Sequence, residues 1–544
     1  MTHNAPRSGL ARTLITLTVI LAFISSNQIL QTYAAPGDID PSFGTGGRVI
    51  SDVSMNFDEA HAVAVQSDGK IVVAGFAQPS EDDSRDFAVL RYGSTGAPDS
   101  SFGTEGRVLT DFFGGLDEAD AVAIQPDGKI VVAGEAQVFN GNAFEFALAR
   151  YNTNGSLDKT FGDGGKTTTN IIFASRALAI ALQPDGKIIA AGFTTNLTQG
   201  PDMAVARYKI NGSLDDDFGT NGTVTTDFIG GTDIINALTL QSDGKIVAAG
   251  LAQATPTPFA FDFAVVRYDT EGNLDEGFGT GGKVMTDFAS DSKDQGRGVV
   301  VQSNGRIVVA GQTEIDSVSS VALAGYKPDG SIDNTFGFGG KVITTTLGIS
   351  AANCLLLQPD DKLVTAGFTV GATLDFAVLR YFSSGLLDPS FGSGGVVTTD
   401  FQGGPDEALA LAYQPDGKII AVGSTELTTP FATRDFVTAR YNGDNIFDLC
   451  IQDDSNGNLL KINTTSGEYQ FSNCSGLLVG GTAYISRKAG TISLQQNGPD
   501  RRLVAKLDGG THKANATLQL FPQGTTYLIT DRNTLNNTCS CAAQ

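Results

Sequence analysis

Residues 66–75 read Gln-Ser-Asp-Gly-Lys-Ile-Val-Val-Ala-Gly, and this stretch decides the fold. Asp68 and Gly69 separate two apolar runs, and an Asp-Gly pair in that place is typical of a β-hairpin turn. The run after the turn is apolar on both faces, which indicates a strand covered by neighbouring sheets. Gly75 inside that run indicates that another backbone approaches it closely. We therefore expect a buried hairpin here.

Four marker residues of this unit recur in seven copies, at a spacing of about 58 residues. They are a Phe before Gly, the Gln before the turn, the Gly in the apolar run and a Tyr after it. The copies are Phe43, Phe102, Phe161, Phe218, Phe278, Phe336 and Phe391; Gln66, Gln125, Gln183, Gln241, Gln302, Gln358 and Gln414; Gly75, Gly134, Gly192, Gly250, Gly311, Gly367 and Gly423; and Tyr92, Tyr151, Tyr208, Tyr268, Tyr326, Tyr381 and Tyr441. Four markers that keep step exclude chance and indicate a repeat protein.

Each unit contains four strand signals. In the first unit they lie at 48–53, 60–66, 70–77 and 87–92, and we refer to them as the first to fourth strands of a unit. A four-stranded sheet that is buried on both faces and repeated seven times describes a propeller. The sequence therefore predicts an all-β protein with a seven-bladed β-propeller over 37–445.

The motifs also resemble a known family. They include Gly155-Ser-Leu-Asp158 before Phe161, the run Gln183-Pro-Asp-Gly-Lys-Ile-Ile-Ala-Ala-Gly192, and Asp262-Phe-Ala-Val-Val-Arg-Tyr268. Together they resemble the bacterial delta-sixty repeat, a β-propeller family whose function is unassigned. The resemblance covers about 37–445 and implies the fold, but it implies no activity.

The N-terminal 34 residues have the pattern of a secretory signal peptide. Arg7 and Arg12 precede an apolar run over 14–24, and small residues follow at Ala34 and Ala35. We expect cleavage after Ala34, with a site nearer Ser26 as the alternative. The apolar run is shorter than the ~20 residues of a spanning helix. We therefore expect a secreted or cell-surface protein without a membrane span once 1–34 is removed.

The tail, 446–544, is expected to be a second, small domain. Short strand signals at 459–462, 491–495, 503–506, 517–521 and 527–530 predict a β-sandwich-like module. It contains Cys450, Cys474, Cys539 and Cys541, and four cysteines in an exported chain favour disulfides. Cys450 and Cys474 are expected to pair with Cys539 and Cys541, in either order. The chain lacks the paired C-x-x-C spacing of a zinc site.

Spacing separates a constant face of the ring from a variable one. The distances from Gln to Gly and from Tyr to the next Phe do not change, whereas the other two connections vary in length. The variable connections leave the same edge of each sheet. They carry Phe139, Phe144, Phe259 and Phe431, which we predict to contact a carbohydrate or protein ligand. The alternative is that these side chains fold back over the blade edges.

Composition excludes several functional classes. The chain has 544 residues and a formal charge of −23, so we expect no nucleic-acid partner. It has three His, so we expect no His-based zinc site and no Ser-His-Asp triad. His61 lies at a position that varies between units and is interpreted as a surface residue. The paired acids at 58–59, 117–118 and 406–407 are interpreted as a solvated edge.

Two further patterns concern charge. In five units the fourth strand begins with Asp and ends with Arg, and the fifth unit lacks both, which favours one electrostatic arrangement. Oxygen-rich turns such as Asn152–Asp158 lack the distal Glu of an EF-hand, so self-bonded turns are the better interpretation. We expect no metal site or cofactor, although the acidic surface leaves room for weak calcium binding.

The resulting functional prediction is a secreted or cell-surface, non-catalytic binding or scaffold protein that uses the variable face. A polysaccharide lyase or hydrolase with its site at the ring mouth is the first alternative, and it requires unmatched acids or bases in a pocket. A purely structural envelope protein is the second alternative.

Overall fold

The computed structural model describes residues 35–444 except 55, 80–83, 139–142, 197–199, 256–259, 349 and 428–432, together with the backbone of eight strands between Leu449 and Ile529. The expected signal peptide, 1–34, lies outside the described residues. Among the residues that are described, no helix has the length and hydrophobicity of a membrane span.

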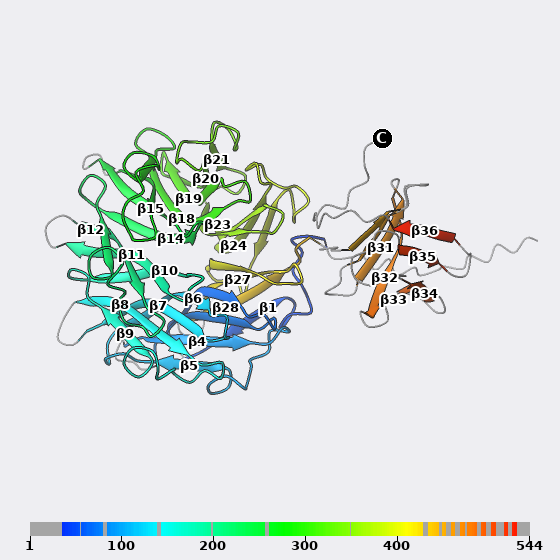
Figure 1. Ribbon diagram of the computed structural model, residues 1–544, viewed down its shortest axis with the longest axis horizontal. Helices are drawn as coiled ribbons and strands as arrows, with labels where there is room; N and C mark the ends of the chain where they lie inside the picture. The colour runs from blue at the N-terminus through cyan, green and yellow to red at the C-terminus, as the bar shows by residue number, and fades with distance from the viewer. Residues whose placement is uncertain are drawn as a thin grey trace, which may run out of the picture. The chain divides into compact units, whose positions relative to one another are not determined.

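Seven four-stranded antiparallel blades are arranged around a common centre (Figure 1), and two of them, over 233–286 and 293–344, are joined by a single parallel pairing of Phe261 with Lys293. Each blade contains the second, third and fourth strands of one unit, followed by the first strand of the next unit. The innermost strands are β2 (Asp58–Val65), β6 (Asp117–Ile124), β10 (Ser175–Leu182), β14 (Asp233–Leu240), β18 (Lys293–Val301), β22 (Ser350–Leu357) and β26 (Asp406–Tyr413). The next strands outward are β3 (Ile71–Ala77), β7 (Ile130–Gln137), β11 (Ile188–Asn196), β15 (Ile246–Thr255), β19 (Ile307–Ile315), β23 (Leu363–Val370) and β27 (Ile419–Leu427).

The outer half of each blade is built in the same way. The third strands are β4 (Asp86–Tyr92), β8 (Phe144–Tyr151), β12 (Gly200–Tyr208), β16 (Ala260–Tyr268), β20 (Val318–Tyr326), β24 (Leu374–Tyr381) and β28 (Thr433–Tyr441). The outermost strands are β5 (Arg107–Thr110), β9 (Lys166–Thr169), β13 (Thr223–Thr226), β17 (Lys283–Thr286), β21 (Lys341–Thr344), β25 (Val396–Thr399) and β1 (Arg48–Ser51). The all-β propeller expected from the repeats is confirmed.

The ring is closed by the N-terminal strand. β1 pairs antiparallel with β28, with Val49 opposite Thr438, so the last blade combines both ends of the repeat region. The innermost strands β26 and β2 also contact one another, as the innermost strands of the other neighbouring blades do. Blade closure therefore depends on one strand that is far from its partners in the sequence.

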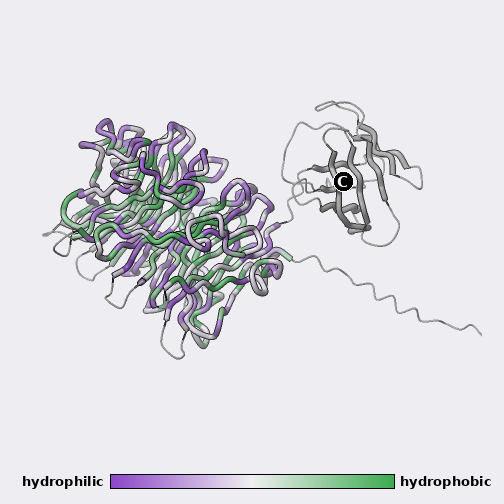
Figure 2. Tube along the Cα trace, turned by 90° about the horizontal axis from the view of Figure 1, so that it is seen from below, coloured by the Kyte–Doolittle hydropathy of each residue, from purple (hydrophilic) through white to green (hydrophobic). Residues whose placement is uncertain are grey.

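The apolar core is divided between the blades. Seven clusters of buried side chains each join two neighbouring blades, and β3 is buried at every position. Hydrophobic residues run along the strands, whereas the connections are largely hydrophilic (Figure 2). This arrangement confirms that the second strand of the hairpin is covered on both faces.

The hairpin turn agrees with the Asp-Gly signal. Gly69 has a φ of 83°, and Asp68 Oδ1 accepts a hydrogen bond from the Lys70 amide at 3.1 Å. A Cβ on Gly75 would lie 1.8 Å from the carbonyl oxygen of Glu59. The expected close backbone approach at this glycine is confirmed.

In six of the seven blades an arginine stands before the last residue of the third strand, which is the fourth strand of a sequence unit. Arg91 Nε donates to Asp99 at 2.8 Å, and its guanidinium lies 4.6 Å from the centre of the Phe102 ring. In the fifth unit Gly325 stands in place of this arginine, and Arg306, the residue before β19, binds Asp333 instead, at 2.6 Å. The arginine thus forms an ion pair with the Asp three residues before the Phe-Gly pair. Our interpretation that it shares one electrostatic arrangement with the acid that begins the same strand is wrong.

The tail forms a six-stranded antiparallel sheet in sequence order and a separate two-stranded hairpin. The strands are β29 (Leu449–Gln452), β30 (Leu459–Ile462), β31 (Glu468–Asn473), β32 (Gly476–Ser486), β33 (Thr491–Gln496), β34 (Arg502–Lys506), β35 (Ala516–Leu520) and β36 (Thr525–Ile529). Cys450 lies on β29, whereas Cys474, Cys539 and Cys541 lie outside the described residues. The disulfides and the sandwich-like packing of this module stay predictions.

Candidate ligand site at the centre of the ring

A β-bulge interrupts every innermost strand at the same place. In β2 the pairing with β3 passes from Ala60 to Ala62, so His61 is left out of the ladder. The glycine of β3 permits this geometry because it has no Cβ to block the Glu59 carbonyl. The residues at the seven bulges are His61, Asp120, Leu178, Asn236, Arg297, Asn353 and Leu409.

These seven bulge residues surround one pocket of about 270 Å³, together with Glu59 and Arg176. Each bulge residue comes from a different blade, so the ring brings together side chains that are about 58 residues apart in sequence. The marker residues are the same in every unit, but the bulge position holds His, Asp, Leu, Asn or Arg. The pocket is therefore asymmetric, although the scaffold around it is repeated. A larger surface groove of about 390 Å³ has no charged lining residue, being lined by Thr346, Leu347, Ser393, Gly394, Val396 and Thr398.

One half of the pocket is a network of charges around Asp120. Arg176 donates two hydrogen bonds to this carboxylate, from Nε at 2.8 Å and from Nη2 at 2.7 Å. Nδ1 of His61 lies 3.0 Å from Asp120 Oδ1. Arg176 also contacts Glu118 at 2.9 Å and Glu135 at 3.0 Å. The network links blades one, two and three.

The network shifts the pKa values of its members. Burial opposes ionisation of Asp120, but the charges of Arg176 and His61 outweigh it and lower the pKa of this carboxyl. Burial likewise opposes protonation of His61, but the hydrogen bond and charge of Asp120 outweigh it and raise the pKa above 6.5. Burial raises the pKa of Glu135 to about 7, against the attraction of Arg176. Perturbed groups of this kind are typical of binding and catalytic sites.

The other half of the pocket is lined by two side-chain amides and a guanidinium. Asn236 Nδ2 donates to the Gly296 carbonyl at 2.8 Å, and Asn353 Nδ2 donates to Glu407 at 2.8 Å. Arg297 Nη2 donates to Gln295 at 3.0 Å, but its buried Nε has no hydrogen-bond partner among the described residues. Burial lowers the pKa of Arg297, although Glu407 partly opposes this. An anionic group of a ligand would satisfy this guanidinium.

His61 was misjudged from the sequence. Its side chain is only 16% exposed and lies in the pocket, so its interpretation as a surface residue is wrong. The only sequence signal for the pocket is variation at a position five residues before each Gln, inside an otherwise regular strand. From the sequence alone, that variation indicates only that the position accepts many residue types. The structure shows that the seven positions line one pocket.

The loop phenylalanines are largely untested. Phe144 begins β8, pairs with Gln137 across the hairpin and is half-buried, whereas Phe139, Phe259 and Phe431 lie outside the described residues. The structure exposes other apolar side chains on the connections that lead into the innermost strands, namely Phe57, Phe113, Ile172, Phe173 and Ile229. These residues were missed because their connections show no motif that repeats in every unit.

A second set of polar clusters lies at the junctions between blades. A buried Asp stands at the start of the innermost strand in five blades, as the first residue in four and as the second residue in β18, and our interpretation of the acids at 58, 117 and 406 as a solvated edge is wrong. Each such Asp lies with two others, one from the third strand of the preceding blade and one from the connection before it. Oxygens of each group lie within 4.8 Å of one another. We call these groups the Asp triads: Asp52, Asp58 and Asp435; Asp86, Asp111 and Asp117; Asp202, Asp227 and Asp233; Asp262, Asp287 and Asp294; Asp375, Asp400 and Asp406.

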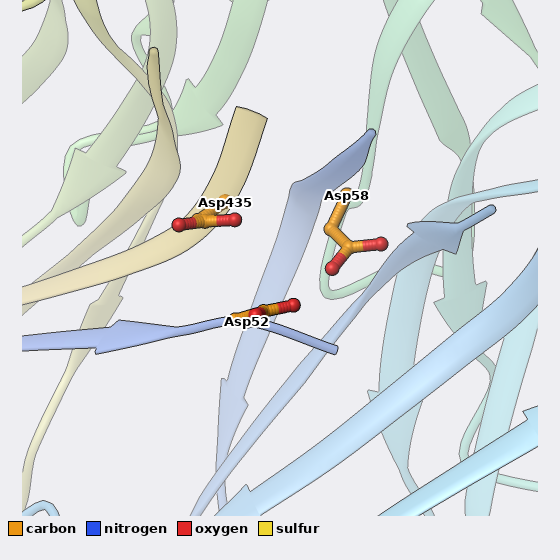
Figure 3. A group of neighbouring side chains, drawn as sticks. All are labelled: Asp52, Asp58 and Asp435. Carbon is orange, nitrogen blue, oxygen red and sulfur yellow. The ribbon is translucent and has the colours of Figure 1, made fainter. Parts of the chain in front are cut away.

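Figure 3 shows the triad in which the two ends of the repeat region meet. Asp52 follows β1, Asp58 begins β2 and Asp435 lies on β28, and their carboxylates face a common space. Asp58 Oδ2 accepts hydrogen bonds from the amides of Val53 at 2.7 Å and Ser54 at 2.9 Å. Burial, opposed by these hydrogen bonds, raises the pKa of Asp58.

With the ring, its bulges and its pocket described, the class of protein is a seven-bladed β-propeller. Seven segments of the chain match the family described as "Domain of unknown function (DUF5122) beta-propeller", at 66–102, 125–161, 183–218, 241–278, 302–336, 358–391 and 414–444. The chain therefore carries seven repeats of this β-propeller family of unknown function. No curated protein matches the sequence.

Several solved structures are similar to this chain at low sequence identity. A protein of unknown function from Dyadobacter fermentans is 11% identical, with a TM-score of 0.42, covering 74% of this chain and 100% of its own. A catalytically inactive virginiamycin B lyase from Staphylococcus aureus with quinupristin is 10% identical, with a TM-score of 0.42 and coverages of 72% and 98%. The polysaccharide lyase Uly1 is 13% identical, with a TM-score of 0.44 and coverages of 74% and 92%.

Proposed function

We propose that this protein is an exported, non-catalytic binding protein that holds a polar ligand in the central pocket. The observation that carries the proposal is the ring of bulge residues, where seven otherwise equivalent units present five different residue types. A purely structural ring has no need for such differences, because all seven positions have the same backbone geometry. Export is supported by the leader pattern in 1–34.

A carbohydrate with an acidic group fits the chemistry of the pocket best. The volume is near the lower end for ligand sites, so it suits one or two sugar units. The amide of Asn236, and Nε of Arg297, which has no partner among the described residues, offer donors to hydroxyl and carboxylate oxygens, whereas Asn353, whose Nδ2 donates to Glu407 and Ala408, offers its carbonyl oxygen as an acceptor. Leu178 and Leu409 offer apolar surface for a sugar ring. The exposed loop side chains of the variable face would extend the contact beyond the pocket.

A second candidate function is hydrolysis or elimination on a polysaccharide. It is favoured by one observation, the contact of His61 Nδ1 with Asp120, since a carboxylate that orients a histidine is a common arrangement for a general base. In that case the binding site and the reaction site would share the same pocket.

The test uses the chain from residue 35 to 544 and a panel of neutral and uronate-containing polysaccharides, with binding measured by calorimetry. Arg297→Leu introduces the residue that two other bulges already hold, so the fold should tolerate it. We expect this variant to bind the acidic polymer at least ten-fold more weakly, which corresponds to about 1.4 kcal/mol. Phe338→Ser is the matched control, because this side chain is 94% exposed on a connection of the constant face.

The outcomes separate the candidates. Unchanged affinity in Arg297→Leu, with affinity lost when the variable loops are shortened, would move the site from the pocket to the loops. Release of shortened products that stops in His61→Gln would establish the catalytic candidate. The absence of binding to every polymer would contradict carbohydrate recognition and favour a structural role.

A further inference from the structure

The Asp triads pose an electrostatic problem that hydrogen bonds within the protein do not solve. Three carboxylates within 4.8 Å repel one another strongly when all are ionised. Burial, followed by the charges of Asp111 and Asp86, raises the pKa of Asp117 to about 7. Burial similarly raises the pKa of Asp233 and Asp406 to about 6. Three carboxylates with oxygens this close need either protons or a nearby cation.

The repeats keep or lose the triad as a unit. Five of the seven blade junctions have Asp at all three positions, and the other two have Asp at none. The junction between units two and three has Glu145, Asn170 and Ser175 in these places. The junction between units five and six has Ser320, Thr345 and Ser350. Because the seven junctions share one geometry, this joint change indicates that the three carboxylates serve one purpose together.

In four of the five triads a buried carboxylate oxygen has no hydrogen-bond partner among the described residues. Oδ2 of Asp117 accepts a hydrogen bond from the Phe112 amide at 2.6 Å, but Oδ1 has no hydrogen-bond partner among the described residues. Asp117 is 0% exposed, and the residue opposite it in β7 is Ala136, whose side chain offers no donor. Asp233 repeats this arrangement, with Ala252 opposite. A buried, unpartnered carboxylate oxygen points to a missing positive ligand.

One side-chain cation accompanies the triads but does not neutralise them. Lys166 Nζ donates to the backbone carbonyl of Asp111 at 2.9 Å, and Lys283 Nζ does the same with Asp227 at 2.8 Å. The equivalent positions after the two junctions without a triad hold Thr223 and Val396. Each of these lysines therefore leaves a net charge near −2 on its triad when all three carboxylates are ionised.

We propose that the five Asp triads are divalent-cation sites that bind calcium between neighbouring blades. Their ligands are carboxylate oxygens, which suit a hard cation, and they contain no His or Cys that would favour zinc or copper. The Asp on the connection is exposed in each triad, so the ion can enter and keep several waters. Since the three ligands come from two blades, the bound ion cross-links the two blades at their junction.

The experiment counts bound calcium and follows stability. The chain from residue 35 to 544 is stripped with EDTA, dialysed against calcium and analysed for bound metal, and its thermal unfolding is recorded with calcium or with sodium at equal ionic strength. We expect about five calcium ions per chain, with dissociation constants on the order of 0.1–1 mM, and a higher Tm in calcium. Magnesium is the second probe, and an equal response would support the same sites with less selectivity.

Two variants locate the ions. Asp117→Asn and the exposed Asp111→Asn each remove one charge from the same triad, and each should lower the count by about one and reduce the calcium-dependent rise in Tm. Glu145→Gln, in a junction without a triad, is the matched control and should change neither. The proposal is overturned if the chain binds no calcium up to about 10 mM, or if calcium binds with the same count in both Asp variants. It is equally overturned if Asp117→Asn raises the Tm to the same extent with and without calcium, because protonated carboxyls then explain the triads.

Discussion

His61, Asp120 and Arg176 come from three consecutive blades and meet at one buried carboxylate. At the residue scale, this contact joins side chains that differ between the repeated units. The markers around these residues stay constant because every unit needs the same turn, glycine and Arg–Asp pair. The bulge position escapes that requirement, since its side chain points into the pocket and not into the core between blades.

The charge of His61 should make stability depend on pH. Its folded-state pKa lies above the unfolded value of 6.5, so its contribution is fully present below pH 6.5 and is lost as the pH rises through the folded-state value. We expect the Tm of the wild type to exceed that of His61→Gln most clearly near about pH 5.5 and least at about pH 8.5. Differential scanning calorimetry at both pH values checks this. A difference that grows with pH would contradict the assigned Asp120 partnership.

At the element scale, the bulge is produced by a pair of strands and not by the bulge residue itself. The glycine in the second strand of each blade lets the carbonyl of the innermost strand approach, and the extra residue then leaves the ladder. The same strand pair also fixes the direction of the first residue of the innermost strand, which lies in the Asp triads. Pocket and triads therefore depend on one local geometry.

Gly134→Ala tests this dependence. The added Cβ would lie 1.9 Å from the Glu118 carbonyl oxygen, so β6 must shift near Asp120. We expect a loss of about 1–3 kcal/mol in the free energy of unfolding, measured by urea denaturation. Gly93→Ala is the control, because the nearest atom to its Cβ would be 3.8 Å away. Equal midpoints for the two variants would show that the close approach does not hold the bulge.

At the scale of the whole molecule, the ring unites residues from its two ends. β1 supplies the outermost strand of the last blade, and Asp52 and Asp58 join Asp435 in the closing triad. The blade boundary is thus shifted by one strand from the sequence repeat. Closure in this way replaces a junction held only by side chains with one held by backbone hydrogen bonds.

The closing strand can be tested with a matched pair of substitutions. Ile50 in β1 and Ile343 in β21 hold equivalent positions, and proline at either removes strand pairing. We expect Ile50→Pro to lower the Tm more, because β1 supplies the backbone pairing that joins the two ends of the repeat region, whereas β21 lies within the continuous series of blades. Hydrogen exchange should also accelerate in β26–β28 only for Ile50→Pro. An equal loss in both variants would argue against a special closing role.

Much of the fold was predictable from local patterns. The strands around Gln66, the turn at Asp68 and Gly69, and the approach at Gly75 all follow from neighbouring residues, and the structure confirms them. The burial of Asp58 was not predictable in this way, because an acid at the start of a strand normally faces water. The partner of Arg306 was also hidden, since this compensating arginine lies in the hairpin connection before β19 and not in the strand that has Gly325.

The sequence by itself determined the number of repeats, their four strands, the hairpin turns and the membership of a propeller family, because each depends on residues close together in the chain. Only the tertiary structure decided which side chains face the pocket, which acids gather at the junctions and which strand closes the ring. A bulge moves one residue out of the ladder, and ring closure brings positions about 58 residues apart into contact. Neither effect leaves a local pattern, so the functional centre emerges only when the blades assemble.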